Sequence, residues 1–316
     1  MTTPAIDDEL LSVRVAELYY DEERTQDEIG ALLNVSRWKV GRLLAQARTD
    51  GIVRIEIVHP RARRLGLERA LRERFTLADA VVVPVASDDD ETMARVAQAA
   101  ADHLTALRPA PRTLAVSWGR TLTAVSERLP DGWARGVHVV QMNGGVSVNR
   151  RPGGAATLAV TIAQRASGEV SLLPSPAILE RLETKQAIER DRTVAGVLAE
   201  ATAADVFLFT AGVCDARSAH VENGYLDAAD IDELSQRGAV GDVLGRYIDA
   251  DGNIVDAELD SRTVGLPLDR LRAADRTVFV TAGRAKHDVA RTVITSGLCT
   301  MAVTDEETAL TLLEEK

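Results

Sequence analysis

Apolar positions along the first fifty residues recur at the spacing of short helices. A first helix is predicted over residues 7–20, where the apolar stripe consists of Leu11, Val15, Leu18 and Tyr19. Thr25 and Glu28 have the T-x-x-E spacing of a capping box, which predicts that a second helix begins at Thr25. Ser36 is a typical N-cap for a third helix, whose apolar positions are Val40, Leu43, Leu44 and Ala47.

The second and third predicted helices are separated by Asn34, a residue that tolerates the left-handed backbone of a sharp turn. Two short helices joined by such a turn form a helix-turn-helix unit, with the small Gly30 where the helices cross. The third helix is predicted to end at Asp50-Gly51, and the alternation over residues 52–58 predicts a short strand. The alternative is a plain helical hairpin with solvated basic residues.

In a helix-turn-helix the second helix of the pair enters the major groove. Arginine and lysine side chains suit phosphates and the O6 and N7 atoms of guanine, and small polar side chains suit neighbouring phosphates. The outward face of the third helix and the helix starts provide such residues: Gln26, Ser36, Arg37, Lys39 and Arg42. Trp38 lies on the same outward face. Thr25 and Arg48 complete the predicted DNA-binding set.

From residue 79 onward, short apolar runs alternate with helical stretches. The predicted strands are Ala80–Val83, Thr113–Ser117, Val137–Met142, Val170–Leu173, Val206–Thr210, Thr277–Ala282 and Cys299–Val303. The predicted helices lie near 91–107, 120–128, 155–167, 185–201, 227–236, 287–296 and 305–315, and Thr304 and Glu307 have the spacing of a capping box for the last one. Continuous apolar runs are typical of strands buried on both faces, so the pattern predicts a doubly wound, mostly parallel α/β domain.

Four of these strands run directly into glycine-bearing turns. Ligands of open α/β sheets bind beyond the carboxyl ends of the strands, where glycine lets the backbone approach closely. The Gly119-Arg120-Thr121 sequence offers N–H donors, a guanidinium and a hydroxyl to an anion, and Lys286 adds a second cation. The residues of these turns predicted to bind an effector are Ser117, Gly119, Arg120, Thr121, Asn143, Gly144, Gly145, Gly212, Gly283 and Lys286. They suit a phosphate or a phosphorylated sugar, although glycine after a strand is often simple turn geometry.

Charge is distributed unevenly along the chain. The net charge of the whole chain is −11, which by itself argues against a nucleic-acid partner. Residues 36–74, however, contain eleven arginines or lysines against four acids, whereas residues 1–35 contain two against nine. One basic stretch on an acidic protein favours a small DNA-contacting module attached to a larger body.

Several classes of protein are disfavoured. Every stretch of membrane-spanning length carries a charge, and the acidic N-terminus is wrong for a secretory signal, so a cytoplasmic protein without a membrane partner is expected. Two cysteines are too few for a disulfide framework or a four-ligand zinc site, and the five histidines lack metal-ligand spacing. There is no P-loop, and Gly238, Gly241 and Gly245 lack the spacing of a dinucleotide fingerprint. No cofactor and no metal are predicted.

Between the two parts, residues 61–75 combine six arginines with Leu67, Leu71 and Phe75 at four-residue spacing. They are interpreted either as a linker helix that helps two protomers pair or as a solvated linker. The predicted organisation is therefore a DNA-binding domain over 1–58, a linker helix over 59–78 and an effector domain over 79–316.

The order of these motifs resembles the SorC/DeoR-type sugar-binding transcriptional regulators of bacteria, over nearly the whole chain. The N-terminal residues that carry the resemblance are Ala16–Tyr20, Thr25–Ile29, Ser36-Arg37, Arg42–Leu44, Ala47-Arg48 and Gly51–Val53. In the body they are Ser117–Leu122, Asn143–Gly145, Gly238–Asp242, Asp249–Gly252, Gly283 with Lys286, and Thr304–Glu306.

The resemblance implies a regulator that binds a double-stranded DNA operator, works as a dimer or tetramer and senses a phosphorylated sugar without turning it over. By position, Arg120 and Thr121 would hold the phosphate, Lys286 would be a second contact, and Asp242 would accept hydrogen bonds from sugar hydroxyls. The alternative from another class is a sugar-phosphate isomerase, aldolase or deaminase with an attached helix-turn-helix. A pure interaction scaffold is a third and weaker possibility.

Overall fold

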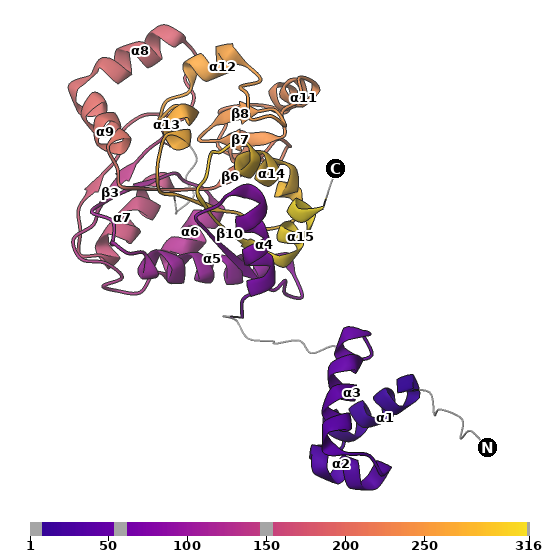
Figure 1. Ribbon diagram of the computed structural model, residues 1–316. Coiled ribbons are helices and arrows are strands. Elements are labelled where there is room, and N and C mark those ends of the chain that lie inside the picture. The colour runs from indigo at the N-terminus through magenta and orange to yellow at the C-terminus, as the bar shows by residue number, and fades with distance from the viewer. Residues whose placement is uncertain (1–7, 54–61, 146–153, 315–316) are drawn as a thin grey trace. The chain divides into compact units, whose positions relative to one another are not determined.

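The structure, a computed structural model, describes residues 8–53, 62–145 and 154–314. The chain divides into two compact units, Met1–His59 and Pro60–Lys316. Figure 1 shows the helices and strands of both units.

The first unit contains the three predicted helices, α1 (Asp8–Tyr20), α2 (Gln26–Leu33) and α3 (Arg37–Thr49). The capping box of α2 is confirmed, because Thr25 Oγ1 accepts from the Glu28 N–H and the Thr25 N–H donates to the Glu28 carboxylate at 2.9 Å. The Ser36 hydroxyl caps α3 by accepting from the Lys39 N–H at 3.2 Å. One small core holds the unit together: Val15, Leu18, Ile29, Val40, Leu43 and Leu44.

The turn between α2 and α3 has the predicted left-handed residue, since Asn34 has φ of 52°. Gly30 is required where the turn folds back, because a Cβ at this position would lie 2.8 Å from the Val35 carbonyl oxygen. The two helices and this turn are consistent with a helix-turn-helix. Most of the strand predicted over 52–58 lies outside the described residues.

The second unit is built on a seven-stranded, entirely parallel sheet with the order β1-β10-β9-β5-β2-β3-β4. Its strands are β1 (Asp79–Val83), β2 (Thr113–Val116), β3 (His138–Gln141), β4 (Val170–Ser171), β5 (Val206–Phe209), β9 (Thr277–Val280) and β10 (Met301–Asp305). The predicted α/β fold class is therefore confirmed.

Side chains of each strand alternate between two apolar cores, one on each face of the sheet. Val206 and Leu208 of β5 face one core and Phe207 and Phe209 face the other, which explains why the strands are continuous apolar runs. One core is covered by α5 (Asp89–Ala106), α6 (Arg120–Arg128) and α7 (Ala155–Arg165). The other is covered by α4 (Leu65–Phe75), α9 (Arg192–Thr202), α13 (Leu268–Arg272), α14 (His287–Thr295) and α15 (Glu306–Leu313). Figure 1 shows α5, α6 and α7 together on the lower side of this unit.

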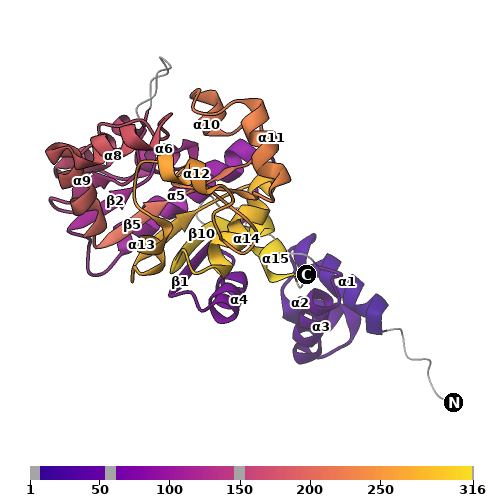
Figure 2. The same ribbon diagram turned by 90° about the horizontal axis from the view of Figure 1, so that it is seen from above.

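A second, antiparallel sheet of three short strands was not predicted. It consists of β6 (Ala211–Val213), β7 (Gly241–Val243) and β8 (Arg246–Ile248) in the order β6-β7-β8. β7 and β8 form a tight hairpin at Leu244 and Gly245, which have φ of 57° and 83°. The helices α11 (Ala228–Gln236) and α12 (Ala257–Arg262) lie near this small sheet in Figure 1, and α10 (Ala219–Glu222) lies next to α11 in Figure 2.

The residues expected to form a linker helix include α4, which packs within the second unit beside β1 and α15. Its Leu71 is fully buried, and its buried Glu68 accepts from the Val82 N–H at 3.0 Å. The guanidinium of Arg63 binds both oxygens of Glu68, at 2.7 and 2.8 Å. The Arg64 N–H donates to the Val82 carbonyl at 2.8 Å, so the outer edge of β1 is covered.

Two predicted helix boundaries are wrong. The helix expected over 185–201 is two helices, α8 (Leu182–Arg190) and α9, because the chain turns at Asp191, which caps α9. The last helix is capped by Asp305 instead of Thr304: the Asp305 carboxylate accepts from the Thr308 N–H at 2.8 Å. The Thr304 hydroxyl is buried without a hydrogen-bond partner among the described residues.

No helix in the described part of the chain is long and apolar enough to cross a membrane.

Replacing Gly30 with alanine is predicted to loosen the first unit, since the added Cβ meets the Val35 carbonyl at 2.8 Å. The matched control is Gly41→Ala in α3, where the nearest atom is the flexible end of Gln26 at 3.4 Å and alanine favours the helix by about 1 kcal/mol. Hydrogen exchange in the full-length chain should show faster exchange of α2 and α3 amides for Gly30→Ala only. Equal protection in the two variants would contradict this view of the turn.

Candidate functional site

A cavity of about 520 Å³ opens at the carboxyl ends of the central strands of the large sheet. Its lining includes the residues that follow β2, β5 and β9. β2 and β5 are neighbouring strands in the middle of this sheet. The strand that follows β2 is β3, on one side of this pair, whereas the strand next to β5 on the other side is β9. The cavity therefore lies at the topological switch point, where open α/β sheets bind their ligands.

The start of α6 forms one wall of this cavity. Gly119 precedes the helix with φ of 147°, a conformation that favours glycine, and a Cβ there would lie 3.1 Å from Thr210. No side chain caps α6, so the first N–H groups of the helix have no capping partner in the described chain. Free N–H groups and the positive end of the helix dipole are favourable for an anion.

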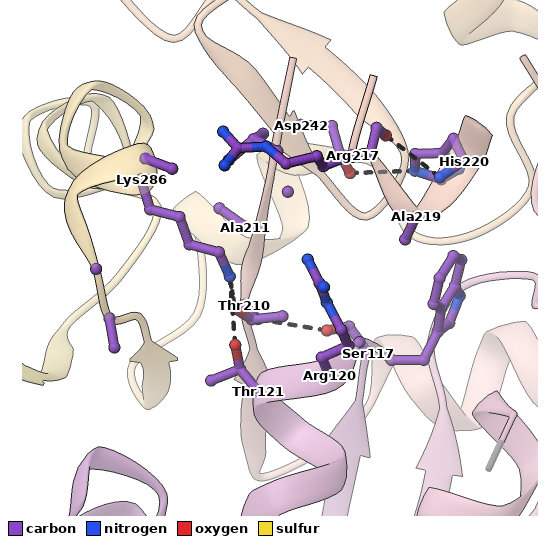
Figure 3. A pocket seen from close by; sticks show the side chains of 18 of the residues that line it. Ser117, Arg120, Thr121, Thr210, Ala211, Arg217, Ala219, His220, Asp242 and Lys286 are labelled. Carbon is purple, nitrogen blue, oxygen red and sulfur yellow. Dashed lines mark hydrogen bonds and ion pairs between the residues drawn. The ribbon is translucent and has the colours of Figure 1, made fainter. Parts of the chain in front are cut away.

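Lys286 reaches the same wall from the loop after β9. Its Nζ donates to the hydroxyls of Thr121, at 3.2 Å, and of Thr210, at 3.4 Å (Figure 3). The side chain is only partly exposed, and burial lowers the pKa of Lys286 to about 8; Asp242 raises this pKa and Arg120 lowers it. A cation with hydroxyl groups beside it is thus held where an anionic ligand would enter.

Arg120, like Lys286, forms no ion pair with a carboxylate among the described residues. Figure 3 shows its side chain extending from the start of α6 into the space between Thr210 and His220. The two other lining arginines are paired: Arg217 with Asp215 at 2.6 Å and Arg284 with Glu307 at 2.5 Å. The lining also contains the acids Asp89 and Asp90 of α5.

Asp242 of β7 forms the opposite wall with His220. Its Oδ2 accepts from the Gly245 N–H at 2.9 Å and lies 3.3 Å from His220 Nε2. Both side chains are buried, and His220 packs edge-on against Trp118 at a centroid distance of 5.6 Å. Asp242 Oδ1 lies over Gly212, where a Cβ would be 2.0 Å away, so glycine is needed at this point. The result is a carboxylate held rigidly at the wall of the cavity.

Most of the predicted effector-binding residues come together in this cavity: Ser117, Gly119, Arg120, Thr121, Asn143, Gly212, Asp242, Gly283 and Lys286 line it. Gly144 and Gly145 do not line it. Instead, the Gly144 carbonyl accepts from the indole N–H of Trp118 at 2.7 Å, and a Cβ on Gly145 would collide with the same indole. Gly145 thus allows Trp118 to pack beside the cavity, and Gly144 is needed for the close approach of Pro176, whose carbonyl oxygen would lie 2.1 Å from a Cβ.

Sequence reasoning missed Thr210, His220, Arg217 and Arg284 as lining residues. The histidines lack metal-ligand spacing in the sequence, which gives no reason to expect a site at His220, yet Asp242, 22 residues later, lies beside it. Thr210 and Arg284 lie next to the predicted glycine-bearing turns, and this position in the sequence could have identified them as lining residues.

In the first unit, the start of α3 presents the predicted DNA-contacting side chains to solvent. Trp38 is 81% exposed, and Arg37 is 70% exposed with a loose ion pair of 3.5 Å to Asp27. Arg42 is exposed as well. Three predicted residues have structural partners instead: Thr25 is engaged in the capping box, Ser36 caps α3, and the Arg48 guanidinium donates to the Tyr20 hydroxyl at 2.9 Å.

Comparison with known proteins agrees with both parts of the chain. The Sugar-bind family model, which describes a sugar-binding domain, matches residues 59–314. The chain belongs to the SorC/DeoR family of sugar-binding transcriptional regulators.

Relatives of this regulator align over almost their full length. The deoxyribonucleoside regulator of Bacillus subtilis is 28% identical over 96% of this chain and 97% of its own. The transcriptional regulator LsrR of Klebsiella pneumoniae is 30% identical over 98% of this chain and 94% of its own. The crystal structure of the full-length sorbitol operon regulator SorC from Klebsiella pneumoniae superimposes with a TM-score of 0.73 at 28% identity, covering 98% of this chain and 99% of SorC.

Arg37→Ala and Arg42→Ala are each predicted to weaken binding of the full-length regulator to a duplex selected by it from a random-sequence pool. An arginine that contacts a base edge lowers the affinity for the wrong base by about 5- to 100-fold. Loss of a phosphate contact reduces the slope of log affinity against log salt concentration by about one. Arg14→Ala removes an exposed arginine of α1 that is paired with Glu17 at 3.0 Å, and serves as the control. Fluorescence anisotropy across salt concentrations measures both effects; unchanged binding in both α3 variants would place recognition elsewhere.

Proposed function

We propose that this transcriptional regulator binds a phosphorylated sugar in the cavity of its second unit, and that the ligand controls binding of its first unit to an operator. The observation that carries the proposal is the convergence of Lys286, Arg120 and the uncapped start of α6 on one wall. The phosphate would lie at this wall and the sugar hydroxyls opposite.

The electrostatics of this wall suit a phosphate group. A phosphate dianion accepts several charge-assisted hydrogen bonds, for which the α6 N–H groups, the Lys286 ammonium and the Arg120 guanidinium are available donors. Thr121 and Thr210 keep the ammonium in place when no ligand is bound. Because the site is partly buried, these interactions are less screened by salt than those of surface charges.

The opposite wall suits sugar hydroxyls. Asp242 is fixed by the Gly245 N–H and His220, and its carboxylate can accept hydrogen bonds from two neighbouring hydroxyls. His220 is a positioning residue: it holds Asp242 and is itself held by Trp118, Tyr225 and Tyr247. Asn143 contributes an amide oxygen that is buried and unpartnered among the described residues, which fits a further hydroxyl donor.

The named relatives are transcriptional regulators, which favours a sensor over an enzyme. Lys286, Asp242 and His220 are nevertheless groups that sugar-phosphate isomerases, aldolases and deaminases could use for proton transfer. Incubating the purified regulator with pentose and hexose phosphates separates the two functions, since a sensor leaves each compound unchanged.

Control of DNA binding follows if the ligand binds more tightly to one arrangement of the regulator than to another. A helix-turn-helix protein reads two half-sites through two copies, so we propose that the active form is a homo-oligomer. The ligand would then shift the population of oligomers whose two first units fit both half-sites.

A panel of phosphorylated pentoses and hexoses, added to the regulator on its selected duplex, is predicted to contain a compound that changes duplex affinity at least tenfold. Lys286→Met and Arg120→Ala should abolish this response and leave duplex binding without ligand unchanged, because both residues belong to the second unit. Lys185→Met, which removes an ion pair of α8 away from the cavity, is the control and should respond normally. An unchanged response in the Lys286 and Arg120 variants would exclude this site.

Ligand affinity is also predicted to depend on pH through Lys286. Below a pKa of about 8 the ammonium is charged in the free regulator, and above it the charge is lost. Near pH 7 and above, the phosphate is mostly a dianion, so affinity should fall above pH 8 by up to about tenfold per pH unit. In Lys286→Arg, whose side chain stays charged, calorimetric titration should show no such fall; equal pH dependence in both proteins would contradict the assignment.

A further inference from the structure

Three consecutive acidic residues, Asp305, Glu306 and Glu307, lie where β10 passes into α15. Asp305 is buried and fixes the loop on the rim of the cavity, since its Oδ2 accepts from the Gly283 N–H at 3.0 Å. The same carboxylate caps α15 through the Thr308 N–H. The loop after β9 and the first turn of α15 are therefore joined as one structural element.

The third acid makes a second connection to the same loop. The carboxylate of Glu307 pairs with Arg284 at 2.5 Å, and Arg284 lines the cavity with a side chain that is 81% exposed. An anion in the cavity would compete with Glu307 for this guanidinium. Occupation of the cavity would then leave the three acidic residues without the positive charge of Arg284.

The second acid faces the other way, toward the start of the second unit. Glu306 Oε1 lies 2.9 Å from Arg64 Nε, and each side chain is 25% exposed. The Nε–H does not point at an acceptor, so this contact is an ion pair without a hydrogen bond. Arg64 is the residue before α4, and its N–H is bonded to Val82 on the edge of the sheet. Residues 62–64 are the first described residues of the second unit after the segment that joins it to the first unit.

We propose that the acidic turn Asp305–Glu307 transmits occupation of the cavity to residues 62–64, where the chain leads to the DNA-binding unit. The proposal rests on the proposed function, because it needs an anionic ligand. When the ligand draws Arg284 away from Glu307, the negative charge of the turn attracts its remaining cation, Arg64, more strongly. Residues 62–64 are then held more tightly on β1. α4 and α15 are also bonded at their other ends, Arg74 to Leu313, so a change at one helix start is shared by both helices.

The test begins without any ligand, on the full-length regulator. Arg284→Gln removes the same cation from the turn and should slow hydrogen exchange of amides in residues 62–70. The expected slowing is about two- to fivefold, the range for an ion pair of this exposure. In the Glu306→Gln background the Arg284→Gln change should have no effect, because the carboxylate that holds Arg64 is gone. Equal slowing with and without Glu306, or no slowing at all, would overturn the proposal.

A matched control is available in α8, where Glu189 pairs with Lys185 at 2.9 Å and is also 25% exposed. Glu189→Gln removes an ion pair of the same length and exposure away from the acidic turn. In this background Arg284→Gln should slow exchange of residues 62–70 as it does in the natural sequence. Loss of the effect here too would mean that removing any such ion pair abolishes it, and would contradict a specific role of Glu306.

The second arm adds inorganic phosphate and measures both its binding, by thermal stabilisation, and exchange of residues 62–70. Binding with slower exchange in the natural sequence, and binding without slower exchange in Glu306→Gln, supports the proposal. Binding without any change of exchange overturns it. If phosphate does not bind, that result counts against the phosphate site of the proposed function, and the ligand-free comparison alone decides the role of the acidic turn.

Discussion

The candidate site depends on a positive charge placed at the carboxyl edge of a parallel sheet. Lys286 is held there by two threonine hydroxyls in surroundings that lower its pKa, which makes a free ammonium costly and an anionic partner favourable. Glycines at Gly119 and Gly212 let the backbone approach this point, and the strand order places it at the switch point. We propose that the cation, the helix start and the facing carboxylate divide the cavity into an anion-binding wall and a hydroxyl-binding wall.

The uneven charge of the chain corresponds to two separate tasks. The first unit exposes arginines and a tryptophan at the start of α3, as expected for contact with a polyanion. The second unit is acidic overall, and its cavity is lined by the cations Arg120, Arg217, Arg284 and Lys286. An acidic body does not attract DNA by itself, so binding depends on how the first unit is presented. Regulation then requires a physical link between the cavity and the start of the second unit, and the turn at Asp305–Glu307 lies between them.

Sequence patterns were sufficient where local physics dominates. Strands such as β5 were predicted because both faces are buried, and the α2 and α3 caps because Thr25 and Ser36 act on neighbouring N–H groups. The β7–β8 hairpin was missed because its strands have three residues each and contain the buried polar residues Asp242 and Arg246. The pairing of His220 with Asp242 depends on that hairpin. No local signal in the sequence indicates it.

The last helix illustrates the limit of a spacing rule. Thr304 and Glu307 have the spacing of a capping box, yet β10 ends at Asp305, two residues beyond the predicted end at Val303. Asp305 therefore becomes the cap, and Glu307 pairs with Arg284. The end of β10 is determined by its pairing with β1, and a local sequence pattern contains no information about this pairing.

The central claim is that a phosphate group, held by the cationic wall, provides most of the ligand's affinity. Isothermal titration of the full-length regulator with a matched pair, the sugar phosphate that changes duplex binding and the same sugar without its phosphate, tests this directly. The account predicts that removing the phosphate weakens binding at least a hundredfold, as expected when two charge-assisted contacts are lost. Equal affinity for the two compounds would contradict it.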